Sequence, residues 1–303
     1  MNLKRFLHMP LLRTLAFLLC LSILSGGAFA AYGDDAPTTL PELDCEAIYM
    51  LELTTGTIIT DKNSTEKLYP ASITKVMTAL VAVMYGTLED NVTFSYNSIF
   101  GLPAEYRTYA YSEGEKATLR QCLYSMLLPS VNEACIAVAE YVAGSVEAFV
   151  DLMNATAVEL GCTNTHFANP VGLHDEEHYT TASDLALIFR YALSYGVLYD
   201  IMSTTSFTLS ATNLSDAKTI TNSNRLILQN NQYYDSRVIC GKTGFTTPAG
   251  NTLVTYSESD GLSFITVILK AATGVTFSGT TSLLDFCDET LVLNTVDGLF
   301  PYA

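Results

Sequence analysis

One stretch of this 303-residue chain marks a change from strand to helix: Tyr69-Pro70-Ala71-Ser72-Ile73-Thr74-Lys75-Val76-Met77-Thr78-Ala79-Leu80. A strand pattern runs into it, and an apolar pattern with helical spacing runs out of it. Pro70 suits the start of a helix, because the N–H that proline lacks has no partner in the first turn. The sequence therefore predicts a helix that begins here, with Ser72 at or near the N-cap, and that ends at about Tyr85.

Ser72 and Lys75 form an unusual pair for a helix start. Glu or Gln usually stands three residues after a serine N-cap, whereas a cation in the first turn opposes the helix macrodipole. Residues i and i+3 share a helix face, so the amine can reach the hydroxyl. A hydroxyl beside an amine with a depressed pKa is an activated nucleophile. On this pair alone, a capped helix with an exposed lysine remains the other interpretation.

The N-terminus has the pattern of a secretory signal peptide. Lys4, Arg5 and Arg13 precede an apolar run at 15–24, and a small-residue cleavage site follows at 28–30. We expect cleavage after residue 30 and a linker over 31–44. An uncleaved anchor is the alternative, although the run is short for a membrane span.

Composition excludes several kinds of partner. Without residues 1–30, 12 basic and 31 acidic residues remain, a formal charge of −19. This charge argues against nucleic acid and against adhesion to an anionic membrane. Six cysteines remain and none forms a C-x-x-C pair, so a zinc ribbon or a thioredoxin-type site is not indicated. Disulfides and buried free thiols both stay open.

The order of the predicted elements indicates an α/β fold. Strands are expected at 46–53 and 57–60 and again at 237–243, 252–256 and 262–269, with a hairpin turn at 260–261. Between them lie loops with short helices at 86–116 and then a run of helices, and a helix near 279–291 closes the chain. We predict a mainly antiparallel sheet built from both ends of the chain, flanked by helices, with an inserted all-helical lobe. The catalytic domain should span 45–291 and the tail 292–303, and the cleft between lobe and sheet is the expected ligand site.

Two further motifs follow Ser72. Ser130-Val131-Asn132 lies 58 residues on, and Lys242-Thr243-Gly244 lies 112 residues beyond Ser130. Each alone has an ordinary structural interpretation: a capping box from Ser130 to Glu133, and a strand that ends in a turn. All three motifs in this order are typical of β-lactamases and penicillin-binding proteins.

The chain resembles the low-molecular-weight penicillin-binding proteins of the serine D-alanyl-D-alanine carboxypeptidase family. The resemblance runs from about Cys45 to Leu269 and extends well beyond the three motifs. It also includes these segments: Leu127-Leu128-Pro129, Gly144-Ser145-Val146-Glu147-Ala148-Phe149, Thr165-His166-Phe167-Ala168-Asn169-Pro170-Val171-Gly172-Leu173, His178-Tyr179-Thr180-Thr181-Ala182 and Phe245-Thr246. Two positions depart from the family pattern, Val131 where glycine is usual and Glu133 where aspartate is usual. Because Ser130 and Asn132 are retained, we expect a changed cleft shape and not a loss of activity.

The resemblance implies a role for each motif residue in the chemistry. Ser72 would attack the carbonyl between two terminal D-alanines, and Lys75 would be the general base. Ser130 would pass the proton to the leaving amine. Asn132 would hold the substrate amide and steady Lys75.

The resemblance also implies how the substrate is held. Lys242, Thr243 and Gly244 would bind the free C-terminal carboxylate, and the backbone N–H groups of Ser72 and Phe245 would form the oxyanion hole. The expected partners are peptidoglycan stem peptides that end in D-Ala-D-Ala, with β-lactams as inhibitors that acylate Ser72. No cofactor and no metal are implied, and the oligomeric state stays open.

The sequence also contains partial matches to motifs of other activities. His174-Asp175-Glu176-Glu177-His178 matches an inverted zinc-protease motif, but its surroundings predict a loop, and that motif needs a helix. No Glu-x-x-x-Asn pattern of a fast β-lactamase lies between Asn132 and Lys242. Endopeptidase or transpeptidase activity, a β-lactamase and a non-catalytic wall-binding module remain alternatives. Leu283–Ala303 is acidic, so we expect an exported enzyme, secreted or associated with the cell wall, without a stable membrane anchor.

Overall fold

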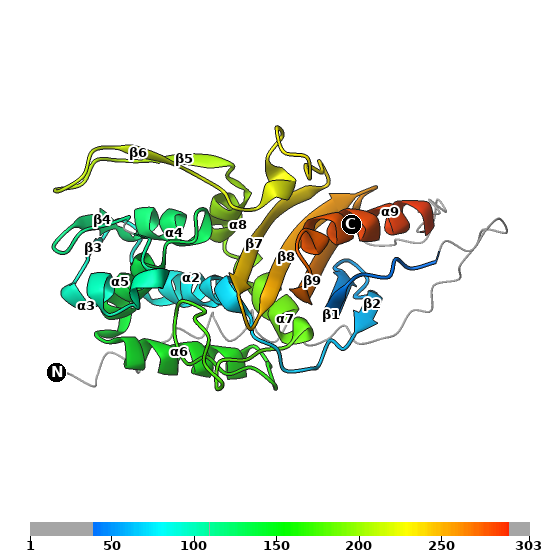
Figure 1. Ribbon diagram of the computed structural model, residues 1–303, viewed down its shortest axis with the longest axis horizontal. Coiled ribbons are helices and arrows are strands. Elements are labelled where there is room, and N and C mark those ends of the chain that lie inside the picture. Colours follow the sequence, from blue (N-terminus) through cyan, green and yellow to red (C-terminus); the bar gives the residue numbers. More distant parts are fainter. Residues whose placement is uncertain (1–38, 109, 291–303) are drawn as a thin grey trace, which may run out of the picture. The chain divides into compact units, whose positions relative to one another are not determined.

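The two ends of the described chain meet in one five-stranded sheet (Figure 1). The computed structural model describes residues 39–108 and 110–290, so the predicted signal peptide, most of the linker and the tail lie outside the described residues. The strand order is β2-β1-β9-β8-β7 and every pairing is antiparallel. The strands are β1 (Cys45–Glu52), β2 (Ile58–Lys62), β7 (Val238–Thr246), β8 (Gly250–Ser259) and β9 (Leu262–Ala271).

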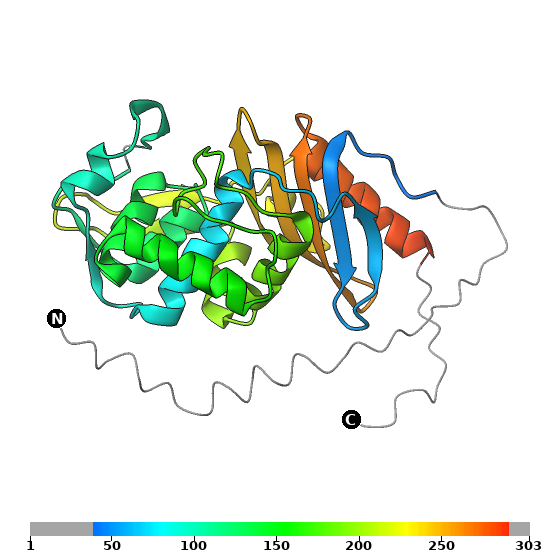
Figure 2. The ribbon, with the colours of Figure 1, turned by 90° about the horizontal axis from the view of Figure 1, so that it is seen from below.

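The sheet carries helices on both faces, as the sequence of β9 requires. Its side chains alternate between two cores: Val267 and Leu269 join the core that continues into the helical lobe, and Ile268 joins the core beneath the last helix. Accordingly α7 (Ala182–Leu193) contacts β9 and β1, and α9 (Val275–Thr290) contacts β8 and β9. Figures 1 and 2 show α9 running along the sheet beside these strands.

The predicted helices form the lobe beside β7 (Figure 2). The helix expected after Pro70 is α2 (Thr74–Tyr85), which is buried over most of its length and contacts the helices around it. Those helices are α4 (Leu119–Leu127), α5 (Asn132–Ala143) and α6 (Val146–Glu159). A capping box begins α4, in which the side chains of Thr118 and Gln121 each accept from the other residue's backbone N–H.

The fold class and the β8–β9 hairpin are also confirmed, and the turn residues Asp260 and Gly261 have the positive φ angles, 47° and 78°, of a two-residue hairpin turn. The lobe, however, is not purely helical. The short helices expected within 86–116 are α3 (Tyr96–Phe100) and η3 (Ala104–Tyr106). Short elements that the sequence did not predict are β3 (Asn91–Thr93), β4 (Lys116–Thr118), α8 (Gly196–Ser203), β5 (Ser206–Leu209), β6 (Lys218–Thr221) and η4 (Arg225–Ile227). These strands are short and mostly exposed, so they lack the apolar alternation by which strands are predicted.

None of the described helices is, by itself, long and apolar enough to cross a membrane. The bent pair α7–α8, with an angle of 105° at its break, passes that test only by length and composition.

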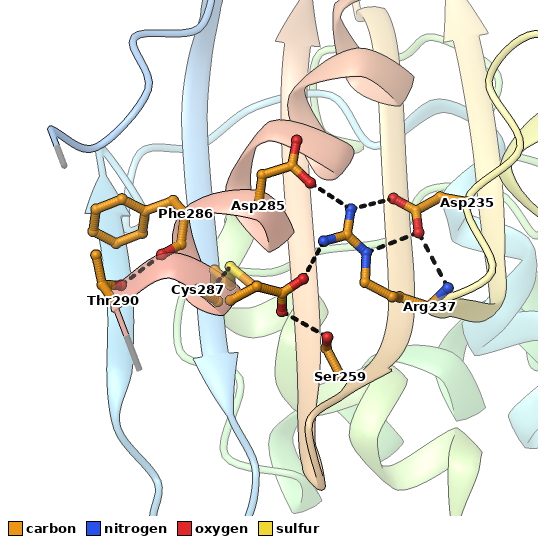
Figure 3. Close-up of polar contacts among 9 residues, drawn as sticks. Asp235, Arg237, Ser259, Asp285, Phe286, Cys287 and Thr290 are labelled. Atoms are coloured by element: carbon orange, nitrogen blue, oxygen red, sulfur yellow. Dashed lines mark hydrogen bonds and ion pairs between the residues drawn. The ribbon is translucent and has the colours of Figure 1, made fainter. Parts of the chain in front are cut away.

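Ion pairs of Arg237 connect α9 to the segment that leads into β7 (Figure 3). Arg237 lies 2.6 Å from Asp235 just before β7 and reaches Asp285 and Asp288 on α9 at 2.7 and 2.5 Å. Ser259 at the end of β8 donates to Asp288 as well. This network joins three segments that are distant in sequence and holds the helix whose first turn borders the cleft described below.

Candidate active site

Ser72 lies in a single 3₁₀ turn, η2 (Ala71–Ile73), that leads into α2. The N-cap of α2 is Ile73, which has no side-chain capping bond, so Ser72 lies one residue before the N-cap, as the sequence predicted in placing it at or near that position. The Ser72 hydroxyl instead accepts a hydrogen bond from the Lys75 amine at 2.8 Å. The predicted contact between hydroxyl and amine, one helical turn apart, is therefore present.

Two glycines let other backbone segments approach this turn closely. Gly172 has φ +90°, and a methyl group there would overlap the carbonyl oxygen of Ala71. A methyl group at Gly244 would lie 2.8 Å from the Ser72 nitrogen. Ala71 itself has a positive φ of 49°, an uncommon conformation for a residue with a side chain. The Ser72 turn is thus held between the loop that carries Gly172 and strand β7.

Lys75 is fully buried. Its amine donates to Ser72 Oγ and to the carbonyl oxygen of Val171, both at 2.8 Å. Burial lowers the pKa of Lys75, while Cys135 and Glu133 act in the opposite direction. A buried lysine with a lowered pKa, in contact with a hydroxyl, has the properties of a general base.

Ser130 stands at the turn between α4 and α5, with a positive φ of 69°. Val131 is the N-cap of α5, so the alternative of a capping box at Ser130 is wrong. The buried Ser130 hydroxyl has no hydrogen-bond partner among the described residues. Asn132 donates to the carbonyl oxygen of Tyr106 at 2.7 Å, and this is the contact found for its amide in place of the expected one with Lys75. Ser130 therefore has a hydroxyl free to bond a ligand.

Lys242 and Thr243 lie on β7 but face different surroundings. Lys242 is fully buried and donates to the carbonyl oxygen of Thr243 at 3.0 Å. Burial, together with the positive charge of Lys75, lowers the pKa of Lys242 to about 7. Thr243 is half-buried, and its hydroxyl shares a 2.8 Å hydrogen bond with Ser223. The Thr243 side chain lines the cleft and can contact a ligand there. The Lys242 side chain is buried and bonds to the backbone of β7.

A cleft of about 450 Å³ brings most of the predicted residues together. It is lined by Ser72, Ser130, Asn132, Thr243, Gly244 and Phe245. Lys75 and Lys242 lie behind its wall. A larger hollow of about 660 Å³ lies among α3, α5 and α6, but it contains none of the predicted residues, so size does not identify the site.

The cleft has further lining residues that sequence reasoning missed. They are Ser223, Arg225, Tyr233, Asn251, Thr273, Gly274 and Phe277. Arg225 is exposed, and its guanidinium carbon lies 5.8 Å from the centre of the Phe277 ring. No motif links these residues, because they come from η4, the loop before β7, β8 and the start of α9. The one feature of the sequence that could have pointed to them is Arg225, which lies two residues after Ser223 in a polar segment before the third motif.

The histidine segment 174–178 forms a loop, as predicted. His178 is buried, and its Nδ1 accepts from the N–H of Ala168 at 3.0 Å. Its Nε2 lies 2.7 Å from the Thr74 hydroxyl and therefore carries the proton in the neutral ring. Burial lowers the pKa of His178 to about 4. Both ring nitrogens are thus engaged in holding the loop against α2.

All six described cysteines are buried free thiols. Of the two possibilities that the sequence left open, the structure therefore shows free thiols.

Comparison with known proteins places this geometry in context. The model of a family described as D-alanyl-D-alanine carboxypeptidase matches residues 34–273. The D-alanyl-D-alanine carboxypeptidase DacF of Bacillus subtilis is 31% identical over 289 residues, covering 91% of this chain and 70% of the relative. DacC of Escherichia coli is 32% identical over 267 residues, covering 83% and 64%. The chain thus spans about two thirds of the length of these relatives.

Solved structures share the fold over nearly their whole length. The DD-transpeptidase of Streptomyces K15 has a TM-score of 0.76 and 26% identity, covering 83% of this chain and 100% of that chain. A D-alanyl-D-alanine carboxypeptidase of Mycobacterium tuberculosis has a TM-score of 0.75 and 25% identity, covering 86% and 96%.

Proposed function

Because this chain belongs to the D-alanyl-D-alanine carboxypeptidase family, we propose that it removes the terminal D-alanine from peptidoglycan stem peptides that end in D-Ala-D-Ala. The observation that carries the proposal is the 2.8 Å contact between Ser72 Oγ and the buried amine of Lys75, at a cleft lined by Ser130 and Thr243. This arrangement provides a nucleophile, a base, a proton donor and a carboxylate contact in one place.

Acylation begins with the neutral form of Lys75. Its amine takes the proton of the Ser72 hydroxyl as Oγ bonds to the carbonyl carbon between the two D-alanines. The carbonyl oxygen becomes negatively charged and is held by the backbone N–H groups of Ser72 and Phe245. The bond to the terminal D-alanine then breaks, and the Ser130 hydroxyl delivers its proton to the departing amine while it receives the proton that Lys75 took from Ser72, so Lys75 is neutral again. Water hydrolyses the acyl-enzyme, which returns the Ser72 hydroxyl.

The third motif predicts that Lys242, Thr243 and Gly244 bind the free carboxylate of the substrate. Lys242 is fully buried and does not line the cleft, so further groups at the cleft surface are candidates for this contact. Thr243 offers its hydroxyl, and Arg225 carries the one charge among the described residues that line the cleft. We assign an ionic contact to Arg225 and a hydrogen bond to Thr243, beside the predicted contact with Lys242.

The same chemistry indicates the partners and the location of the enzyme. β-Lactams resemble the acyl-D-Ala-D-Ala end and should acylate Ser72. The substrate is a wall polymer, so the enzyme acts outside the cytoplasmic membrane, secreted or associated with the wall. The described elements from Cys45 to Thr290 contain the complete constellation, and we propose residues 45–291 as the catalytic domain.

A second activity is favoured by one comparison. A DD-transpeptidase shares this fold, and an amine in place of water would convert hydrolysis into transfer at the same acyl-enzyme. Adding a D-amino acid acceptor to the assay separates the two outcomes by product mass.

The direct experiment measures D-alanine release from an acyl-D-Ala-D-Ala peptide by the wild-type protein and by Ser72→Ala. A peptide that ends in L-alanine is the matched control substrate. The proposal predicts release by the wild type from the D-Ala-D-Ala peptide alone. Penicillin labelling without D-alanine release would instead favour a binding module, and rapid turnover of penicillin would favour a β-lactamase.

A further inference from the structure

A short segment at residues 103–108, which we call the strap, is tied to the start of α5 at two points. Asn132 donates from its amide to the carbonyl oxygen of Tyr106 at 2.7 Å. The carboxylate of Glu133 accepts both from the backbone N–H of Thr108 at 2.6 Å and from its hydroxyl at 2.5 Å. The two neighbouring residues of the second motif therefore hold the same strap.

Glu133 is unusual because it is a carboxylate with only 1% of its surface exposed. Burying a charge is costly unless it is well bonded. The first turn of α5 offers a favourable place, since the helix macrodipole stabilises an anion there. Each of the two carboxylate oxygens of Glu133 accepts a hydrogen bond from Thr108. This bonding indicates that Glu133 has a definite role, which the mechanism above does not use.

The charged and titratable groups around the Lys75 amine come from three elements. Glu133 and Cys135 lie on α5, Lys242 lies on β7, and His178 lies in the loop before α7. Burial raises the pKa of the Cys135 thiol to about 11, so it is neutral near pH 7. His178 is neutral there too, and Lys242 is never an anion. Among these groups Glu133 is the carboxylate, and its charge favours the protonated form of Lys75.

We propose that Glu133 is a positioning residue with two linked effects: it fixes the strap that orients the Asn132 amide, and it supplies the negative charge that faces the Lys75 amine. The inference rests on the proposed function of the same site. Removing the charge should make Lys75 easier to deprotonate. Removing the contact with the strap should disturb Asn132 without changing that charge.

Two variants separate these effects. Glu133→Gln keeps an oxygen for the Thr108 N–H and offers an amide N–H to the Thr108 hydroxyl, so the bridge can persist without the charge. Thr108→Val keeps the charge and removes the hydroxyl. The matched control is Glu115→Gln, because Glu115 is another buried carboxylate of the lobe, accepting from Ser112 and Thr212 at 2.8 Å.

The experiment measures the second-order rate constant of acylation by penicillin between pH 4 and 9. The acid limb of that profile reports deprotonation of Lys75. We expect Glu133→Gln to move it to lower pH by about 0.5 to 1 unit, because an opposite charge that favours the protonated amine is lost. Glu115→Gln and Thr108→Val should leave the limb in place. Thr108→Val should slow acylation at every pH by about tenfold, the loss of one hydrogen bond to a charged group.

An acid limb that is unmoved in Glu133→Gln, or moved equally in Glu115→Gln, would overturn the electrostatic effect. A wild-type rate in Thr108→Val would overturn the strap effect. Thermal unfolding of each variant, measured across the same pH range, shows that it is folded, and acid unfolding would move the acid limb to higher pH, opposite to the shift expected for Glu133→Gln. Because the readout is penicillin acylation, failure of the wild type to release D-alanine would refute the proposed function without touching this result.

Discussion

Replacing Arg225 with glutamine removes the one charge that lines the described cleft. The guanidinium is stacked against Phe277, whose ring centre lies 5.8 Å away, so it is held in place before the ligand arrives. A hydrogen bond to a charged group contributes about 1.5 to 3 kcal/mol. At about 1.4 kcal/mol per factor of ten, the loss corresponds to a decrease in kcat/KM of about 10- to 150-fold. Thr243 remains, so activity should not vanish.

The assay compares two substrates that differ only at the C-terminus, an acyl-D-Ala-D-Ala peptide with a free carboxylate and the same peptide as its amide. The wild type should prefer the free carboxylate, and Arg225→Gln should lose this preference while its rate on the amide changes by less than about threefold. Arg120→Gln is the matched control, because Arg120 is an exposed arginine paired with Glu89 away from the cleft. An equal loss on both substrates would refute the assignment of the carboxylate to Arg225.

Three further predictions concern the residues that hold the site. Gly172→Ala should lower the free energy of unfolding by more than about 2 kcal/mol and slow penicillin acylation, because the methyl group meets backbone at a positive φ. Gly56→Ala, also at a positive φ but in open space, is its control. For His178, the unfolded state takes up a proton near pH 6.5 and the folded state only near pH 4, so urea titrations should show stability falling by about 3 kcal/mol over that interval. His178→Gln should flatten this slope. Arg237→Met leaves the carboxylate of Asp235 with 7% exposure and no ionic partner, and should cost about 3 kcal/mol in urea unfolding.

Each of these predictions has a clear contrary result. Equal losses in Gly172→Ala and Gly56→Ala would show that the positive φ, and not the close approach to the Ser72 turn, sets the cost. A slope between pH 6.5 and 4 that survives in His178→Gln would assign the proton uptake to other groups. Wild-type stability in Arg237→Met would mean that the ion pairs between Arg237 and α9 contribute as little to the free energy of unfolding as exposed salt bridges do.

Local contacts could be predicted from the sequence, and contacts made across the fold could not. The bond between Ser72 and Lys75 follows from helical spacing, and the Asp260-Gly261 turn follows from residue type. Ser130 shows where such reasoning fails. Its spacing to Glu133 matches a capping box, but its φ of 69° turns the hydroxyl away from that role. The surrounding structure imposes the positive φ of Ser130, so the residues next to Ser130 in the sequence do not predict it.

The carboxylate anchor shows the same limit. Lys242 belongs to a motif that predicts contact with the ligand and is fully buried, while Arg225 belongs to no predicted motif and lines the cleft. Burial of a lysine depends on what packs over the strand, in this case the lobe that carries Lys75. Phe277, on the first turn of α9, contacts Arg225 at the cleft because the ion pairs of Arg237 hold α9 against the sheet. The burial of Lys242 and the position of Phe277 both depend on contacts between segments that are distant in sequence.

The central claim is that Ser72, activated by Lys75, is the residue that becomes acylated. Intact-mass measurement after mixing with penicillin tests it most directly, on the wild type, on Ser72→Ala and on Lys75→Ala. We expect one adduct of the mass of penicillin on the wild type, none on Ser72→Ala, and formation at least about a hundredfold slower on Lys75→Ala. An adduct of the same mass on Ser72→Ala, formed at the wild-type rate, would contradict it.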